Sequence, residues 1–186
     1  MVSLSLCTLE QANMLRVVAY VCALLALAHG QTTNVQSCSL SSAPLPINAH
    51  IEGCVDPPCI LPQGTYAVVN VIFRAPRPIQ SMTTVATAHI MGLPIPYGLG
   101  EAAHTCNYLT NSQCPLDKGE VVQYTLHMFI ESFFPAGTNV TVELRVTEGW
   151  GLFAPTLWCI RVPLSIVGPL PSSNISAHNA TITDKV

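Results

Sequence analysis

The residues of this sequence that could carry out chemistry do not form a catalytic pattern. His89, His104 and His127 could each act as a general base, but none stands in a motif with an acidic or nucleophilic partner. The Gly-x-Ser-x-Gly, His-Glu-x-x-His, phosphate-loop and Gly-x-Gly-x-x-Gly motifs are also absent. Because catalysis requires a nucleophile with a base, a carboxylate pair or a metal cluster, we predict that the protein is not an enzyme.

Cysteines are the second reactive group. Six of the eight lie beyond residue 30, namely Cys38, Cys54, Cys59, Cys106, Cys114 and Cys159. An even set in an oxidising compartment predicts three disulfides, for which six cysteines allow 15 pairings. Sequence proximity favours Cys54 with Cys59 and Cys106 with Cys114, which leaves Cys38 for Cys159. A zinc site is the alternative, but there is no Cys-x-x-Cys and the histidines are scattered, so we expect neither a metal nor a cofactor.

Residues 1–30 have the pattern of a secretory signal peptide. Arg16 precedes an apolar run from Val17 to Ala28, and small residues follow around Gly30. The signal is complete from Met14, so residues 1–13 are either an upstream start or an extended amino-terminal region. The apolar run is shorter than the roughly 20 residues of a membrane span. We therefore expect a secreted protein, extracellular or in the lysosomal lumen, whose folded domain begins at residue 31.

Composition narrows the class of protein. Charged residues make up 9% of the chain, hydrophobic residues 49%, and the net charge is −3. No basic run is present, which argues against a nucleic-acid partner and against binding to anionic membranes through a polybasic segment. The 156 residues that remain after removal of 30 from 186 suit one domain. Two interpretations stay open: a neutral monomeric secreted domain, or one whose extra apolar residues line a cavity.

The elements that would position these residues are strands separated by Gly and Pro turns. We expect strands at 31–38, 66–75, 79–91, 121–130, 140–147 and 157–167. The first is expected to be an edge strand, and Pro163 indicates an edge position for the last. No segment beyond residue 30 has a helical period. The pattern predicts an all-β sandwich of about seven strands over residues 31–168.

One stretch suggests an apolar cavity. The segment His89–Tyr97 is predicted to be an apolar turn, because Pro94 and Pro96 cannot contribute to a sheet ladder. The strand before it carries small residues on one face, which either leave room for a ligand or allow the opposite sheet to pack closely. Together with the strand that ends at Phe133-Phe134, this turn is expected to form the mouth of the cavity.

Three surface features complete the sequence predictions. Residues 169–186 are polar and predicted to be disordered. Asn139, Asn174 and Asn179 are glycosylation acceptors. The apolar residues Trp150, Leu152 and Phe153 alternate with glycines, which predicts an exposed loop that contacts a membrane or a partner protein, or else packs on the sandwich.

The order of these motifs is similar to that of a known family. From Cys38 to Val167 the chain contains Cys38, Cys54-Val-Asp-Pro-Pro-Cys59, Met91-Gly-Leu-Pro-Ile-Pro-Tyr97, Cys106 with Cys114-Pro115, Phe134-Pro135 and Trp158-Cys159-Ile-Arg-Val-Pro163. This order resembles the ML lipid-recognition family, and in particular its soluble sterol carriers. Gly98 departs from those carriers, which usually have another proline after the aromatic residue.

The resemblance implies an immunoglobulin-like β-sandwich with a lipid between its two sheets and the disulfide pairing favoured above. It also implies four ligand-binding residues by position in the motifs: Ile95, Tyr97, Ile130 and Phe134. The expected function is a carrier of a sterol or similar apolar lipid. The alternatives are a recognition protein for a microbial lipid, a carrier of a fatty acid, and an adhesion-type sandwich with a filled core.

Overall fold

The computed structural model describes Arg16 and residues 31–39, 41–151 and 153–170. The chain divides into two compact units, Met1–Thr32 and Thr33–Val186, and the fold below is that of the second. Most of the expected signal peptide, Leu152, and the expected tail from residue 171, with Asn174 and Asn179, lie outside the described residues. Among the described residues, no helix has the length and apolar character needed to cross a membrane.

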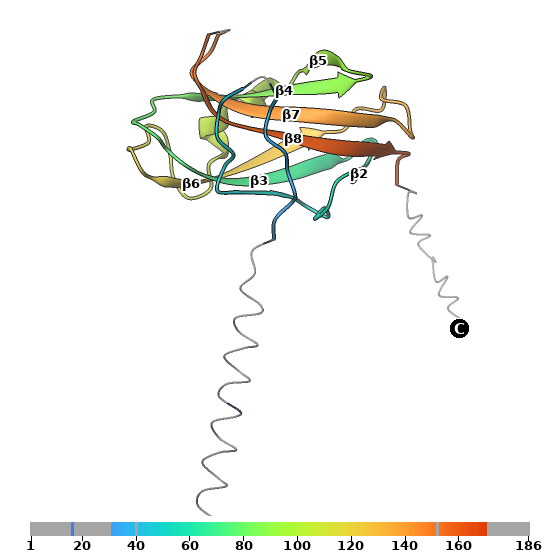
Figure 1. Ribbon diagram of the computed structural model, residues 1–186, viewed down its shortest axis with the longest axis horizontal. Helices are drawn as coiled ribbons and strands as arrows, with labels where there is room; N and C mark the ends of the chain where they lie inside the picture. The colour runs from blue at the N-terminus through green and yellow to red at the C-terminus, as the bar shows by residue number, and fades with distance from the viewer. Residues whose placement is uncertain (1–15, 17–30, 40, 152, 171–186) are drawn as a thin grey trace, which may run out of the picture. The chain divides into compact units, whose positions relative to one another are not determined.

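In the part of the chain that the structure describes, eight strands form two sheets that pack face to face, as the two layers in Figure 1 show. The strands are β1 (Asn48–Ile51), β2 (Cys59–Pro62), β3 (Tyr66–Arg74), β4 (Met82–Ile90), β5 (Leu93–Tyr97), β6 (Val121–Phe129), β7 (Asn139–Glu148) and β8 (Thr156–Val167), with the 3-10 turns η1 (Gly100–Ala103) and η2 (Thr105–Tyr108). The sheet orders are β1-β3-β6 and β2-β8-β7-β4-β5. The predicted all-β sandwich is confirmed.

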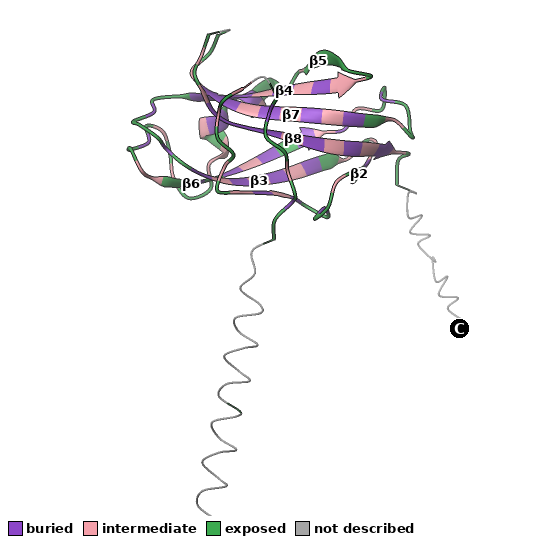
Figure 2. Ribbon diagram, viewed as in Figure 1, coloured by how far each residue is buried: buried purple, intermediate pink, exposed green. Residues whose placement is uncertain are grey.

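The core follows from the period of two in the strands. On β6 the buried residues are Val122, Tyr124, Leu126 and Met128, and the intervening residues are exposed or half-buried. On β3, where both faces are apolar, the structure buries the face that begins with Ala67 and ends with Phe73. Figure 2 shows a similar alternation along β7 and along β8 from Ile160 onward, whereas Leu157–Ile160 at the start of β8 are all buried. The core is therefore the space between the two sheets.

The prediction that His89–Tyr97 is a turn outside the sheets is wrong. Only Met91 and Gly92 form the turn, and Leu93–Tyr97 is strand β5, paired antiparallel with β4. Because β5 is the last strand of its sheet, a proline nitrogen there can face away from the ladder without breaking a hydrogen bond. Residues expected to form a loop thus become the edge of the five-stranded sheet.

Two further strand predictions are wrong. The β-pairing of the described residues 31–38 is an isolated bridge between Gln36 and Arg161, and Thr33 and Asn34 donate single backbone hydrogen bonds to Ala49 and Val55, so this segment is not an edge strand. Strand β8 lies between β2 and β7 instead of at an edge. Its Pro163 is tolerated because backbone N–H groups alternate in direction along a strand. The Arg161 N–H points to Gln36 at 2.7 Å, so the Pro163 nitrogen faces the same side, before pairing with β2 begins at Leu164.

All three disulfides have the predicted pairing. Cys38 is bonded to Cys159, Cys54 to Cys59 and Cys106 to Cys114. The first closes a loop with a sequence separation of 121 residues and attaches the amino-terminal segment to β8. The third fixes the connection between η2 and β6. The long irregular connections are therefore tied to the sandwich by covalent bonds.

Candidate functional site

An apolar cavity lies between the two sheets at one end of the sandwich. Its volume is about 20 Å³, room for about one water molecule and far too small for a lipid in this conformation. It is lined by Ala88, Tyr97, Met128, Phe129, Ile130, Phe134, Val140, Val142, Leu164 and Ile166. A second void of about 10 Å³ shares Met128, Val142 and Leu164 with it. The two voids thus lie along one apolar path into the core.

Small side chains explain why the cavity forms here. Ala88 of β4 lines the first void and Ala67 of β3 the second, and both are buried. A small residue on each inner face leaves a gap that the neighbouring Val and Leu side chains do not fill. The small face of β4 therefore borders the cavity at Ala88, whereas Ala86 is buried without lining either void.

The mouth of the cavity is closed by an aromatic pair. The Tyr97 hydroxyl donates a hydrogen bond of 2.5 Å to the Phe129 carbonyl. The Tyr97 ring stacks on the Phe134 ring with 6.1 Å between ring centroids. The centroids of the Phe134 and Phe133 rings are 4.4 Å apart. Since Tyr97 ends β5 and Phe129 ends β6, this hydrogen bond joins the edges of the two opposite sheets.

Phe134 is positioned by the turn that follows β6. The Gln63 side chain donates to the Phe134 carbonyl at 2.5 Å, and the Gly64 N–H donates to the Ile130 carbonyl at 2.8 Å. Gly64 has a φ of +73°, a conformation that favours glycine. The connection between β2 and β3 therefore holds the turn against the cavity.

The structure brings together three of the four residues carried over from the family motifs. Tyr97, Ile130 and Phe134 line the cavity. Ile95 does not line it; it lies opposite Ala88 in the β4–β5 register and is 46% exposed. Ligand binding by these four residues remains a prediction.

Most residues of the cavity wall have no distinguishing motif in the sequence. Met128, Val140, Val142, Leu164 and Ile166 lie on the buried faces of their strands, and the period of two in the sequence predicts them only as core residues. Nothing local in the sequence separates a core residue that borders a void from one that does not, because the void depends on the strand across from it.

The Tyr97 phenol at the mouth has a raised pKa. Burial raises the pKa of Tyr97 above its usual value, and the negative charge of Glu131 raises this pKa further. The phenol is therefore held in its protonated form, which is the form that donates to the Phe129 carbonyl.

The other end of the sandwich is filled. The Tyr124 hydroxyl and the Thr84 hydroxyl are 2.7 Å apart, and Thr84 is 2.8 Å from the Thr105 hydroxyl. The Trp158 ring lies 6.1 Å from Phe73 and 6.4 Å from Tyr124. Burial strongly raises the pKa of Tyr124. At this filled end, large rings and a satisfied hydroxyl network occupy the space between the sheets. At the mouth, the corresponding space is partly empty.

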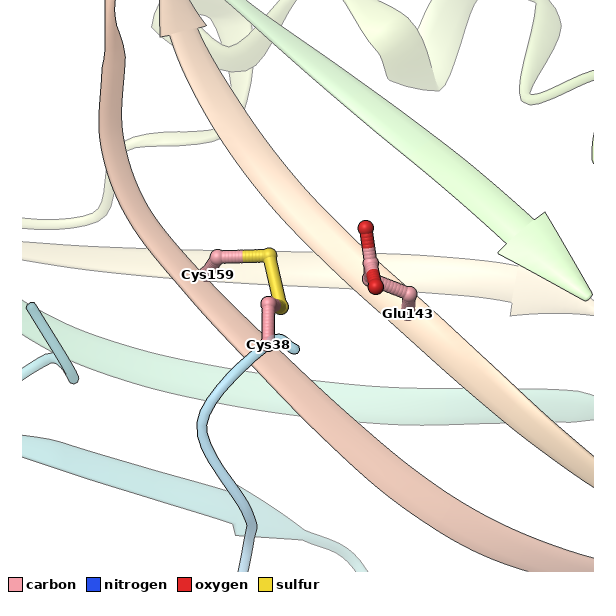
Figure 3. Close-up of side chains that lie close together, drawn as sticks. All are labelled: Cys38, Glu143 and Cys159. Carbon is pink, nitrogen blue, oxygen red and sulfur yellow. A yellow bond between two sulfur atoms is a disulfide. The ribbon is translucent and has the colours of Figure 1, made fainter. Parts of the chain in front are cut away.

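A polar cluster lies on the outer face of the five-stranded sheet. His89 Nε2 is 3.8 Å and Arg161 Nε 4.0 Å from the Glu143 carboxylate. His89 thus has an acidic neighbour 54 positions away that no sequence motif indicates. Figure 3 shows Glu143 beside the Cys38–Cys159 bond. Because both sulfur atoms are in that disulfide, these three residues cannot act as a thiolate metal site.

The loop of Trp150 and Phe153 is exposed at the filled end. Trp150 is 73% and Phe153 95% exposed. Glu148 pairs with Met82 at the start of β4, whereas the cavity borders the far part of β4 at Ala88. The loop therefore does not belong to the mouth. Contact with a membrane or partner remains a prediction, as does glycosylation of Asn139, which is exposed at the start of β7.

The chain is similar in sequence to known proteins over most of its length. The family model of the ML domain matches residues 32–166. The NPC intracellular cholesterol transporter 2 of Bos taurus is 25% identical over 117 residues, covering 63% of this chain and 74% of the relative. The transporter of the same name in Canis lupus familiaris is 25% identical over 122 residues, covering 64% and 75%.

A solved structure shares the fold. The Niemann-Pick type C2 protein from the Japanese carpenter ant superposes with a TM-score of 0.59 at 18% identity, covering 71% of this chain and 98% of the ant protein. The family match extends over the whole sandwich, including the cavity and all three disulfides. The chain is therefore a member of the ML domain family of lipid-binding proteins.

Proposed function

We propose that this protein is a secreted or lumenal carrier that takes a sterol or a similar apolar lipid between its two sheets and transfers it. The observation that carries the proposal is the apolar cavity, closed at its mouth by Tyr97 and Phe134 and continued inward by a second void. Two mammalian relatives are named as cholesterol transporters, which supports a sterol. The signal-peptide pattern of residues 14–30 supports the lumenal or extracellular location.

The ligand must enlarge the cavity, because about 20 Å³ admits no lipid. Opening the mouth breaks the Tyr97–Phe129 hydrogen bond, about 1 kcal/mol net, and separates the aromatic pair, a further 0.5 to 1.5 kcal/mol or so. Burying several hundred Å² of apolar lipid surface at about 25 cal/mol per Å² contributes on the order of 10 kcal/mol before association entropy is subtracted. The gain exceeds these two costs of opening, so a closed mouth is compatible with lipid binding.

A sterol-binding titration with Tyr97→Ala and Phe134→Ala tests the proposal. Each variant should weaken binding by about 1 to 3 kcal/mol, because each removes apolar wall surface. Phe153→Ala is the matched control, since that ring is exposed at the opposite end, and it should bind like the unmodified protein. Unchanged affinity in both cavity variants would place the ligand elsewhere.

One observation favours a second candidate, an adhesion-type sandwich with a filled core: the cavity is small in the closed state. Organic extraction of protein purified from its native source, followed by mass spectrometry, separates the candidates. The carrier should yield a stoichiometric lipid, and the identity of that lipid distinguishes a sterol from a microbial lipid or a fatty acid. A lipid-free native protein that also binds no sterol would favour the filled-core candidate.

A further inference from the structure

The closed mouth separates the apolar cavity from a second hollow of different chemistry. This outer groove has a volume of about 320 Å³ and is lined by Tyr66, Tyr97, Gly98, Leu99, Glu101, Ala102, Tyr108, His127, Met128, Phe129 and Glu131. It shares Tyr97, Met128 and Phe129 with the inner cavity. When the contact between Tyr97 and Phe129 opens, the groove and the cavity become one continuous site.

The outer groove contains negative but no permanent positive charge. Glu101 and Glu131 supply two carboxylates, and His127 supplies an imidazole. Neither lysine nor arginine is among the groove-lining residues in the part of the chain that the structure describes. The charge of Glu131 acts at the mouth itself, since it raises the pKa of the Tyr97 phenol. An anionic end group in this groove would therefore be repelled.

The mouth also requires a hydrogen-bond donor. The Phe129 carbonyl accepts its bond from the Tyr97 hydroxyl, and a lipid that passes between β5 and β6 removes that donor. A carbonyl left without a donor in a partly buried site is unfavourable. A ligand hydroxyl can replace the phenol as donor, whereas an ionised carboxylate only accepts hydrogen bonds.

We propose that the outer groove holds the polar end of the ligand and selects an uncharged hydroxyl, donating to the Phe129 carbonyl, over a carboxylate. This inference rests on the proposed function, because it assumes that the apolar part of the lipid occupies the inner cavity. It assigns sterols and long-chain alcohols as the ligand class and excludes fatty-acid anions. Glu101 and Glu131 are the residues that determine the selectivity.

Displacement of a fluorescent sterol, dehydroergosterol, by two ligands of equal chain length tests the selectivity. At pH 8 palmitate is ionised and hexadecanol is neutral. Hexadecanol should displace the probe at a concentration about tenfold or more below that of palmitate. Glu101→Gln with Glu131→Gln should bring the two ligands to within about threefold, mainly by improving palmitate.

The control is Glu52→Gln, an exposed carboxylate after β1 and outside both hollows, which should leave the ratio unchanged. Equal displacement by hexadecanol and palmitate in the unmodified protein, or a preference that the double variant keeps, would overturn the selectivity while leaving sterol binding intact. Failure of dehydroergosterol itself to bind would overturn the proposed function and this inference together.

Discussion

The two ends of the sandwich are built on the same strands and differ in how they are filled. At the filled end, Trp158, Tyr124 and Phe73 occupy the space between the sheets, and the Tyr124 hydroxyl is hydrogen-bonded to Thr84. At the mouth, Ala88 and aliphatic residues leave an unfilled void.

Side-chain size and hydrogen bonding, more than topology, therefore separate the two ends. β4, β6, β7 and β8 pass through both, so the backbone framework is shared. A fully packed end contributes most of the stability, since removed core atoms leave costly cavities. An underpacked end joined by one interstrand hydrogen bond can open at lower cost.

The largest effect is expected from the disulfide beside Trp158. Replacing Cys38 and Cys159 by Ala removes a bond across 121 residues, which the chain-entropy model values at about 5 kcal/mol. The control is Cys54 with Cys59, whose separation of 5 residues gives about 2 kcal/mol in the same model. Urea denaturation should show this order, and equal losses would contradict it.

Truncation of one ring at each end compares the two directly. Trp158→Ala should lower the free energy of unfolding by about 3 to 5 kcal/mol, because a large ring is removed from a filled core. Phe134→Ala should cost only about 2 kcal/mol, since Phe134 already borders a void. Thermal and urea denaturation measure the loss of stability in both variants. Equal destabilisation would mean that the mouth is as tightly packed as the filled end.

Removal of a hydroxyl at each end compares the hydrogen bonds. Thr84→Val leaves buried Tyr124 and Thr105 without their shared partner and should cost about 1 to 3 kcal/mol. Tyr97→Phe breaks the bond across the mouth and should cost about 1 kcal/mol. Tyr97→Phe should also accelerate sterol association in stopped-flow measurements, and Thr84→Val should not. An association rate unaffected by Tyr97→Phe would show that this bond does not limit opening.

Alkaline pH should separate the two phenols. Burial raises the pKa of both Tyr124 and Tyr97, more strongly for Tyr124. A raised folded pKa contributes stability that is intact below the unfolded value of about 10 and is lost as pH rises through the folded pKa, because the unfolded chain releases its proton first. Tyr124→Phe should therefore reduce the fall in stability above pH 10 more than Tyr97→Phe. The reverse order, measured by urea denaturation from pH 9 to 11, would contradict the burial difference.

The smallest effect is expected in the fluorescence of the exposed loop of Trp150 and Phe153 at the filled end. In Trp158→Phe, Trp150 is the one remaining tryptophan. If the predicted membrane contact exists, liposomes of phosphatidylcholine should shift its emission to shorter wavelength by several nanometres, because an interfacial indole loses water. Phe153→Ala should reduce the shift. An emission maximum that liposomes do not change would remove the membrane as the partner of this loop.

Local sequence patterns predicted the strands β3, β4, β6, β7 and β8 and favoured the disulfide pairs, but not the short strands β1, β2 and β5. The alternation on β6 depends only on a residue and its neighbours, and the three bonds agree with sequence proximity and the family motifs. The family motifs also identified Tyr97, Ile130 and Phe134, which the structure brings to one cavity. Their role in binding is a prediction that the experiments above examine.

The filled end of the sandwich and the closure of its mouth depend on contacts between residues far apart in the sequence. The hydrogen bond from Tyr97 to Phe129 joins residues 32 positions apart on different sheets, and Glu131 acts on Tyr97 across the same gap. Strand β5, where a turn was expected, tolerates Pro94 and Pro96 because it lies at a sheet edge. Sequence periodicity records which face of a strand is apolar, but a void, an edge and a cross-sheet contact depend on what lies opposite that face in space.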